Sequence, residues 1–244
     1  MSSANPYESA STMAPPLTPP GIRHVQVRPI ELLQRGYEFI KPNYWLFLGI
    51  VFVGVLIGSI VPFQILMGTM LLGMFTCMMF HEQGRKVEFG DLFKGFDNVG
   101  DSIIAWLIIL GSIFLMVIPL VIVLFVCLGA VVAITGADGP GIAVGMLVFY
   151  PLLILASCFV YVPFLFMFPL MAEYKLPPMQ ALKLSWAGAK ANLFGLFKYV
   201  LVISLVSFIA ALACYIPAIL LSPISFASLF LLYRDVYERQ LVTG

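Results

Sequence analysis

Residues 103–135 have the sequence IIAWLIILGSIFLMVIPLVIVLFVCLGAVVAIT, and no charged side chain interrupts this run. A helix needs about 20 apolar residues to cross a hydrocarbon core about 30 Å thick, so the run is long enough to span a membrane. The whole chain of 244 residues is 61% hydrophobic and 10% charged, with a mean hydropathy of +1.04. These values differ from those of soluble domains and predict an all-α integral membrane protein.

Three long apolar blocks predict a transmembrane helical bundle of six spans. The blocks cover residues 44–80, 103–171 and 193–233, and each is too long for one upright helix. Each also contains a break: Pro62 in the first, the glycine-rich turn at residues 135–141 in the second, and Pro217 in the third. Dividing the second block again at Pro119 and Pro151 would give eight spans, but the extra pieces would be too short to cross a bilayer.

The charge distribution orients the predicted spans. All 13 Lys and Arg residues lie at or near the ends of spans that face one side of the membrane, which is the positive-inside pattern. We therefore expect the N- and C-termini in the cytoplasm and the protein in a bacterial cytoplasmic (inner) membrane. Residues 1–27 contain five prolines and few aliphatic side chains, so we expect a disordered cytoplasmic arm followed by a single transmembrane domain over residues 28–240.

Three stretches of the chain align without gaps: PIELLQRGY at residues 29–37, EFGDLFKGF at 88–96 and PMQALKLSW at 178–186. Each precedes an apolar block, which divides the domain into units 29–80, 88–171 and 178–233. In each stretch a small residue precedes an aromatic one, and the six residues are Gly36, Tyr37, Gly95, Phe96, Ser185 and Trp186. These are our candidate contacts for lipid or a partner.

The apolar residues of these stretches recur at helical spacing, so each stretch predicts an amphipathic helix. We expect the three helices to lie at the cytoplasmic membrane interface with the aromatic side chain at headgroup depth, each followed by a transmembrane hairpin. True repetition would give a threefold repeat about an axis along the membrane normal. The alternative is that any interfacial helix before a membrane span shows this spacing.

The predicted spans contain few groups for chemistry. Lys198 is the one charged side chain within the span boundaries, and Glu173 lies at the cytoplasmic end of the fourth span, where we expect an interfacial salt bridge. The sequence has no nucleophile–base pair, phosphate-binding glycine loop or metal-ligand spacing, so we expect neither an enzyme nor a cofactor. A net charge of +1 predicts no binding of nucleic acid.

Four methionines recur at helical spacing between residues 67 and 81: Met67, Met70, Met74 and Met78, with Cys77 and His81 alongside. Thioether, thiol and imidazole groups suit Cu(I), but methionine stripes in apolar helices more often fill gaps in packing. The sequence favours packing and leaves metal binding open.

Three prolines, Pro151, Pro163 and Pro169, fall in the predicted fourth span. They would bend the helix and free backbone carbonyls that a neighbouring helix or a ligand must satisfy. They are therefore our candidate residues for a solute path.

The sequences ALKLSW at 181–186, NLF at 192–194 and LYRDVY at 232–237, together with Pro223, resemble a broad group of uncharacterised bacterial six-helix membrane proteins. That group is similar to the membrane domain of glycerophosphodiester phosphodiesterases. The resemblance covers mainly residues 172–238, with a fainter echo in LFKGF at 92–96. It implies the six-helix architecture, and because the soluble phosphodiesterase domain has no counterpart in this chain, it implies no catalytic residue.

Two functions fit these observations. The first is a non-enzymatic scaffold or accessory protein that organises a membrane-protein partner or the surrounding lipid, with contacts at Tyr37, Phe96 and Trp186. The second is a carrier or channel for a small apolar or amphipathic solute, with a path between the repeats near the bilayer midplane, and the bent fourth span motivates it.

Overall fold

The structure is a computed structural model that describes residues 20–60, 62–135, 155, 159–213 and 215–237. This part of the chain is helical, and its β pairing is limited to an isolated bridge between Ile22 and Tyr237. The elements are α1 (Pro29–Ile40), η1 (Lys41–Asn43), α2 (Tyr44–Ile60), η2 (Pro62–Gln64), α3 (Met67–Glu82), η3 (Phe89–Asn98), α4 (Val99–Thr135), η4 (Val162–Phe164), α6 (Met167–Tyr174), α7 (Pro178–Ala191), α8 (Leu193–Leu212) and α9 (Ile216–Val236). The all-α class is therefore confirmed for the described residues.

Prolines and turn residues set the ends of these elements. Pro29 and Pro178 begin α1 and α7, at a position where the missing N–H loses no helical hydrogen bond. Pro62 begins the 3₁₀ turn η2 between α2 and α3, at the break that the sequence predicts. Tyr215, with a left-handed φ of 61°, begins the turn into α9. The predicted turn at 135–141 lies almost entirely outside the described residues.

Four helical segments are long and apolar enough to cross a membrane: Pro29–Ile60, Phe89–Ala133, Leu193–Leu212 and Ile216–Val236. The helices that follow η2 and η4 are shorter, with 16 residues in α3 and 8 in α6. They are shorter because the 3₁₀ turns η2 and η4 divide the apolar sequence before each of them. By length, the described residues therefore provide four candidate spans, compared with the six that the sequence predicts.

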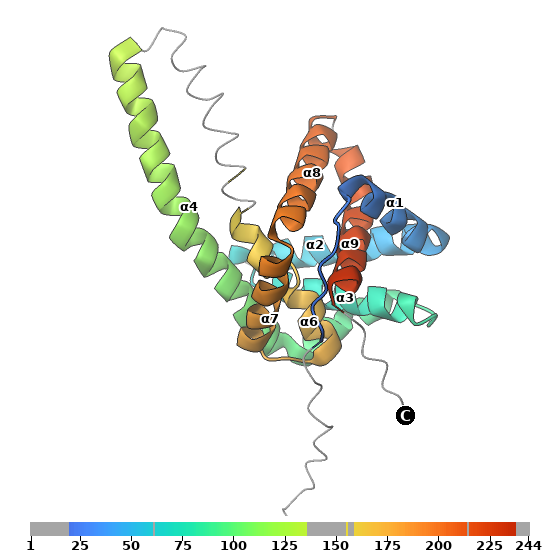
Figure 1. The fold of residues 1–244 in the computed structure, drawn as a ribbon. Coiled ribbons are helices and arrows are strands. Elements are labelled where there is room, and N and C mark those ends of the chain that lie inside the picture. The colour runs from blue at the N-terminus through green and yellow to red at the C-terminus, as the bar shows by residue number, and fades with distance from the viewer. Residues whose placement is uncertain (1–19, 61, 136–154, 156–158, 214, 238–244) are drawn as a thin grey trace, which may run out of the picture.

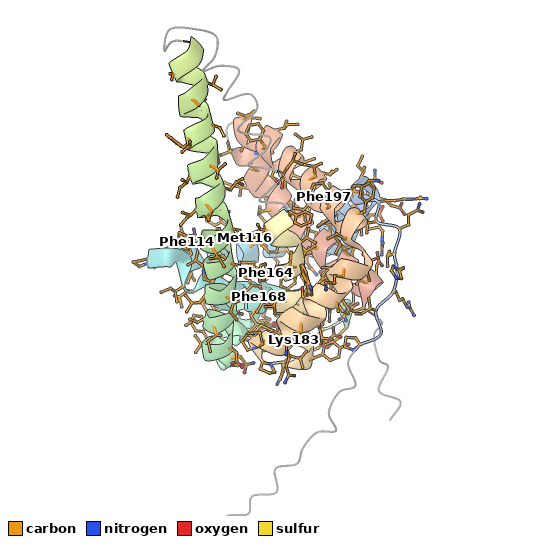
Figure 2. The ribbon with its side chains drawn as sticks, turned by 60° about the vertical axis from the view of Figure 1, so that its left-hand side comes forward. Phe114, Met116, Phe164, Phe168, Lys183 and Phe197 are labelled. Carbon is orange, nitrogen blue, oxygen red and sulfur yellow. The ribbon has the colours of Figure 1, made fainter. Side chains whose placement is uncertain are left out.

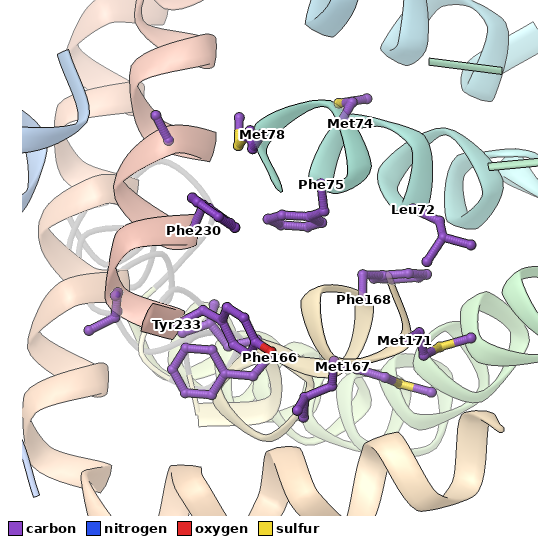
Figure 3. Packing of buried hydrophobic residues seen from close by; sticks show 14 of the residues in the cluster. Leu72, Met74, Phe75, Met78, Phe166, Met167, Phe168, Met171, Phe230 and Tyr233 are labelled. Atoms are coloured by element: carbon purple, nitrogen blue, oxygen red, sulfur yellow. The ribbon is translucent and has the colours of Figure 1, made fainter. Parts of the chain in front are cut away.

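Helices α3, α6 and α9 meet at the centre of the described bundle. In Figure 3, Phe75 of α3 lies between Phe230 of α9 and Phe168 of α6, and all three side chains are buried. Met74 and Met78 of α3 are fully buried above them. Close packing of large, adaptable side chains therefore holds the centre together.

The outer part of α4 extends away from the other helices (Figure 1). Leu115 and Val126 on this helix are 78% and 67% exposed. In the most apolar window of the Phe89–Ala133 segment, none of the side chains is buried against described residues. A surface this apolar is stable in lipid or against another protein, so it supports an integral membrane protein.

The segment before α1 is ordered, so the expectation of a disordered arm up to residue 27 is wrong for residues 20–27. The Val25 N–H donates to Oδ1 of Asn192 at 2.8 Å, and the Asn192 amide donates to the Arg23 carbonyl at 2.9 Å. The Arg23 N–H donates to the Val236 carbonyl at 2.9 Å. The Asn192 side chain thus makes the hydrogen bonds with residues 23 and 25 that a neighbouring β-strand would otherwise make. Val27 packs against Gly195 of α8. Residues 1–19 lie outside the described part.

Candidate functional site

The amphipathic helices α1 and η3 each turn a glycine toward the backbone of a neighbouring helix. A Cβ atom on Gly36 would lie 2.8 Å from the Ser228 nitrogen of α9. A Cβ atom on Gly95 would overlap the Thr69 carbonyl oxygen of α3. Only a residue without a side chain permits this approach, so both glycines are required by close helix packing.

Ser185 occupies the matching place on α7 and uses its hydroxyl to bind the neighbouring backbone. Its Oγ donates to the Pro163 carbonyl at 2.6 Å and accepts from the Phe166 N–H at 3.2 Å. These two backbone groups lie where η4 passes into α6, so the regular α-helical ladder does not pair them with each other. Ser185 therefore fixes α7 to the η4–α6 junction.

The contacts of these three helices follow one order. Helix α1 packs on α9, η3 packs on α3, and α7 packs on η4 and α6. In each case the amphipathic helix of one unit contacts the second apolar helix of the unit before it, and the first unit contacts the third in the same way. The three sequence units are thus linked in a closed ring of contacts.

Tyr37, Phe96 and Trp186 point outward from these contacts. They are 44%, 39% and 42% exposed, although the small residue before each of them is buried. The Trp186 ring also lies 5.1 Å from Nζ of Lys190, and the Tyr37 ring is 6.3 Å from that of Tyr44. The structure therefore places the three predicted aromatic residues at equivalent exposed positions on separate helices, and it does not bring them together in one pocket.

A groove beside α7 is lined by one of the predicted interfacial aromatic residues and by one of the prolines predicted to lie along a solute path. We call it the α7 groove. It has a volume of about 420 Å³ and is lined by Ser112, Met116, Phe159, Val160, Pro163, Phe164, Leu182, Lys183 and Trp186. Figure 2 shows Met116 of α4, Phe164 and Lys183 on the same side of the molecule. The predicted interfacial residue Trp186 and the predicted path residue Pro163 thus line one apolar groove with a lysine in its wall.

A second groove lies at the corresponding place beside α1, and we call it the α1 groove. It has a volume of about 540 Å³ and is lined by Leu33, Gln34, Tyr37, Glu38, Leu221 and Ile224. When Gly36 is matched with Ser185, Leu33, Gln34 and Tyr37 match Leu182, Lys183 and Trp186. The two grooves therefore share an apolar residue and an aromatic residue but differ in charge.

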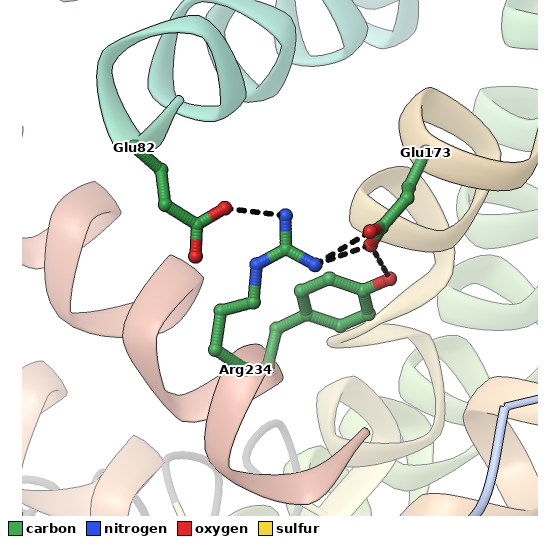
Figure 4. Close-up of polar contacts among 4 residues, drawn as sticks. Glu82, Glu173 and Arg234 are labelled. Atoms are coloured by element: carbon green, nitrogen blue, oxygen red, sulfur yellow. Dashed lines mark hydrogen bonds and ion pairs between the residues drawn. The ribbon is translucent and has the colours of Figure 1, made fainter. Parts of the chain in front are cut away.

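Four residues from the three central helices form a polar cluster that we call the Arg234 cluster: Glu82, Glu173, Tyr233 and Arg234. Arg234 binds Glu82 of α3 at 2.7 Å and Glu173 of α6 at 2.6 Å (Figure 4). The Tyr233 hydroxyl donates to Glu173. The Arg234 side chain is 12% exposed, so this pairing occurs largely out of water. The cluster joins the ends of α3, α6 and α9.

Sequence reasoning found only part of this cluster. Glu173 was predicted to form an interfacial salt bridge, and it does, but its partner Arg234 lies 61 residues away. In the sequence, Arg234 stands out only as one of the 13 basic residues and as part of the segment LYRDVY at 232–237. A usable signal would have been the position of Glu82, Glu173 and Arg234 near the ends of successive apolar segments.

Tyr237 follows α9 and attaches the end of the described chain to α7. Its hydroxyl donates to the Leu184 carbonyl at 2.8 Å, and its ring lies against Gly188, where a Cβ atom would overlap the hydroxyl. Burial raises the pKa of the Tyr237 phenol. The group therefore stays protonated and remains a hydrogen-bond donor at neutral pH.

The remaining candidate residues are the three prolines of the predicted fourth span and the methionine-rich segment at residues 67–81. Where the structure describes them, they take part in packing and hydrogen bonding. Pro169 is buried within α6, Pro163 is half-buried in η4, and Pro151 lies outside the described residues. Met70, Met74 and Met78 are buried in the core. His81 Nε2 lies 2.8 Å from the Phe39 carbonyl. Among the described residues, no group of three or more His, Cys, Asp or Glu side chains could hold a metal ion. The methionines that the structure buries serve packing.

Comparison of the chain with protein-family models, with curated proteins and with solved structures found no match.

Proposed function

We propose that this protein is a non-enzymatic scaffold of a bacterial cytoplasmic membrane, which organises lipid or a membrane-protein partner around three similar units. It has six spans with both termini in the cytoplasm, and the amphipathic helices α1, η3 and α7 lie at the cytoplasmic interface. Each unit contributes one such helix and one transmembrane hairpin.

The observation that carries the proposal is the shared arrangement of the three amphipathic helices. In each, a small residue is buried against a central helix, and the next residue is an exposed aromatic. Tyr and Trp have an apolar body and a polar edge, so they favour the boundary between hydrocarbon and water. Three such helices provide three outward contact sites at the level of the lipid headgroups.

The closed ring of contacts supports the repeat. Unrelated units would not be expected to pack α1, η3 and α7 each against the second apolar helix of another unit. The six-span arrangement is supported by η2 and η4, since each interrupts an apolar segment with the same 3₁₀ turn before a central helix. Turn η2 lies at the break between the first two proposed spans, and η4 bends the proposed fourth span before α6.

The proposal is tested by native mass spectrometry of protein extracted gently from membranes. The test variant combines Tyr37→Ala, Phe96→Ala and Trp186→Ala. The matched control combines Phe52→Ala, Phe125→Ala and Phe208→Ala, which remove one exposed aromatic from each of α2, α4 and α8, with exposed fractions of 50%, 67% and 56%. We expect the test variant to lose retained lipid or a copurifying polypeptide, and the control to retain both. Equal retention in the two variants would contradict the proposal.

A carrier for a small amphipathic solute is the second candidate, and the α7 groove favours it. The groove lies between α4 and the bend at Pro163, where a path between helices would open. An aqueous path predicts that water-soluble thiol reagents reach Cys127, which is exposed on α4, or Cys158. Complete protection of both thiols in the folded protein in a bilayer would exclude such a path.

A further inference from the structure

We infer that the α7 groove binds one anionic phospholipid, with its phosphate beside Lys183 and an acyl chain against Met116 and Phe164. This inference rests on the proposed function, because it names the lipid class that one of the three amphipathic helices holds. The argument uses the charge of the groove, its apolar wall and its difference from the α1 groove.

The charge at the groove is positive. Lys183 lies in its wall, and Lys190 lies over the Trp186 ring, so two ammonium groups flank one indole on the same face of α7. The groove lining contains no acidic residue, and within the described part of the chain neither lysine forms an ion pair with a carboxylate. An anionic phosphate supplies the missing countercharge at the depth where an interfacial tryptophan lies.

The rest of the groove suits a hydrocarbon chain. Met116 of α4 and Phe159, which lies just before η4, are 57% and 58% exposed, and both line the groove together with Pro163. The polar side chain in this wall, Ser112, already donates its hydroxyl to the Ile108 carbonyl of its own helix at 2.8 Å. The volume of about 420 Å³ lies within the range of about 300–1,000 Å³ that holds small ligands.

The α1 groove provides an internal comparison. It has Gln34 at the position of Lys183 and Glu38 at the position of Ala187. The matching position on η3 is Phe93. Lys183 is therefore the single cation among the three corresponding positions, so the preference for an anionic lipid belongs to the α7 groove.

The experiment measures quenching of Trp186 fluorescence by brominated lipids in nanodiscs, using the full chain with Trp45→Phe and Trp106→Phe. Brominated phosphatidylglycerol and brominated phosphatidylcholine are compared at equal dilution in unbrominated phosphatidylcholine. We expect stronger quenching by phosphatidylglycerol. Because one lysine near the surface contributes a factor of about five in binding an anionic lipid, Lys183→Gln should reduce this preference about fivefold.

Lys198→Gln is the matched control, since Lys198 also lies over an aromatic ring, Phe194, but does not line the groove. It should leave the preference unchanged. Met116→Phe adds bulk at the apolar end without adding a second tryptophan, and it should also lower the preference. Native mass spectrometry of Lys183→Gln with all three tryptophans present gives a second reading of retained phosphatidylglycerol that does not depend on the fluorescence background.

The inference is overturned if the starting protein shows no preference for phosphatidylglycerol, or if Lys183→Gln and Lys198→Gln reduce it equally. If the inference fails in this way but the variant lacking Tyr37, Phe96 and Trp186 still loses lipid, the proposed function stands without this site. Conversely, if that variant retains all lipid and partners while Lys183→Gln loses phosphatidylglycerol, the site stands and the scaffold function fails.

Discussion

Arg234 of α9 and Glu173 of α6 form a close ion pair in which Nη1 of Arg234 lies 2.6 Å from both carboxylate oxygens. The second nitrogen of the same guanidinium binds Glu82 of α3 at 2.7 Å. One arginine therefore pairs with carboxylates from two other central helices. Because the three residues lie on the separate helices α3, α6 and α9, the cluster stabilises the contact among all three central helices.

Replacing Arg234 by Gln should strongly destabilise the protein. The change leaves Glu82 and Glu173, whose side chains are 24% and 19% exposed, without a countercharge. Removing one partner of a fully buried pair costs about 3–5 kcal/mol, so we expect a loss of about 2–3 kcal/mol in the free energy of unfolding here. Denaturant unfolding in detergent measures it. Arg35→Gln is the control, because its pair with Asp235 is 43% and 26% exposed and contributes about 0.2–1 kcal/mol. Equal losses would contradict our view of the cluster.

Gly95→Ala should destabilise the contact between η3 and α3. The added methyl group would overlap the Thr69 carbonyl and approach the Gly73 nitrogen, and both are backbone atoms that cannot rotate away. Overpacking of this kind costs about 1–3 kcal/mol. Gly100→Ala meets no atom within 4 Å and lies in α4, so it should be neutral or stabilise the helix by up to about 1 kcal/mol. Thermal unfolding of the two variants provides the comparison, and a stable Gly95→Ala variant would argue against close packing here.

Ser185→Ala should loosen α7 from the η4–α6 junction. The Phe166 N–H, which is buried, would lose its hydrogen-bond acceptor, and the Pro163 carbonyl would lose its donor. An unsatisfied buried group costs about 1–3 kcal/mol. Hydrogen exchange at the amides of residues 164–167 should become faster in the variant. Ser222→Ala serves as the control, since the Ser222 hydroxyl bonds only within its own helix at an exposed site. Unchanged exchange in Ser185→Ala would show that the hydroxyl does not hold the junction.

Asn192→Ala should release the segment at residues 20–27. The Asn192 amide binds the backbone of both Arg23 and Val25, so its removal breaks both of these hydrogen bonds. Limited trypsin digestion of the folded protein should then cut after Arg23 sooner than in the starting protein. Gln180→Ala, an exposed change on α7, should leave the digestion rate unchanged. Equal rates for both variants would show that Asn192 does not order this segment.

The sequence predicted local features well because they depend on neighbouring residues. Pro62 and Pro217 correctly marked breaks between apolar helices, and Gly36, Gly95 and Ser185 were selected from a short gap-free alignment. The structure gives the physical reason for their small size, which is the close approach of a neighbouring helix at Gly36 and Gly95 and the hydroxyl contacts of Ser185.

Contacts between distant parts of the chain could not be predicted in the same way. Arg234 and Glu82 are 152 residues apart, and no periodicity relates their positions. The α7 groove was missed for the same reason, since Met116, Pro163 and Lys183 come from separate elements. The sequence predicts disorder for residues 20–27 because their composition is poor in apolar residues. In the structure, hydrogen bonds from the distant side chain of Asn192 hold this segment in place.

The central claim is that α1, η3 and α7 lie at one membrane interface with their aromatic positions at the same depth. Spin labels on Tyr37→Cys, Phe96→Cys and Trp186→Cys, each in a background with the native cysteines replaced, measure this depth in bilayers through collision with oxygen and with a water-soluble nickel complex. We predict that all three labels lie at the same headgroup depth. A label fully exposed to water, or depths that differ among the three positions by more than a helical turn, about 5.4 Å, would contradict the account.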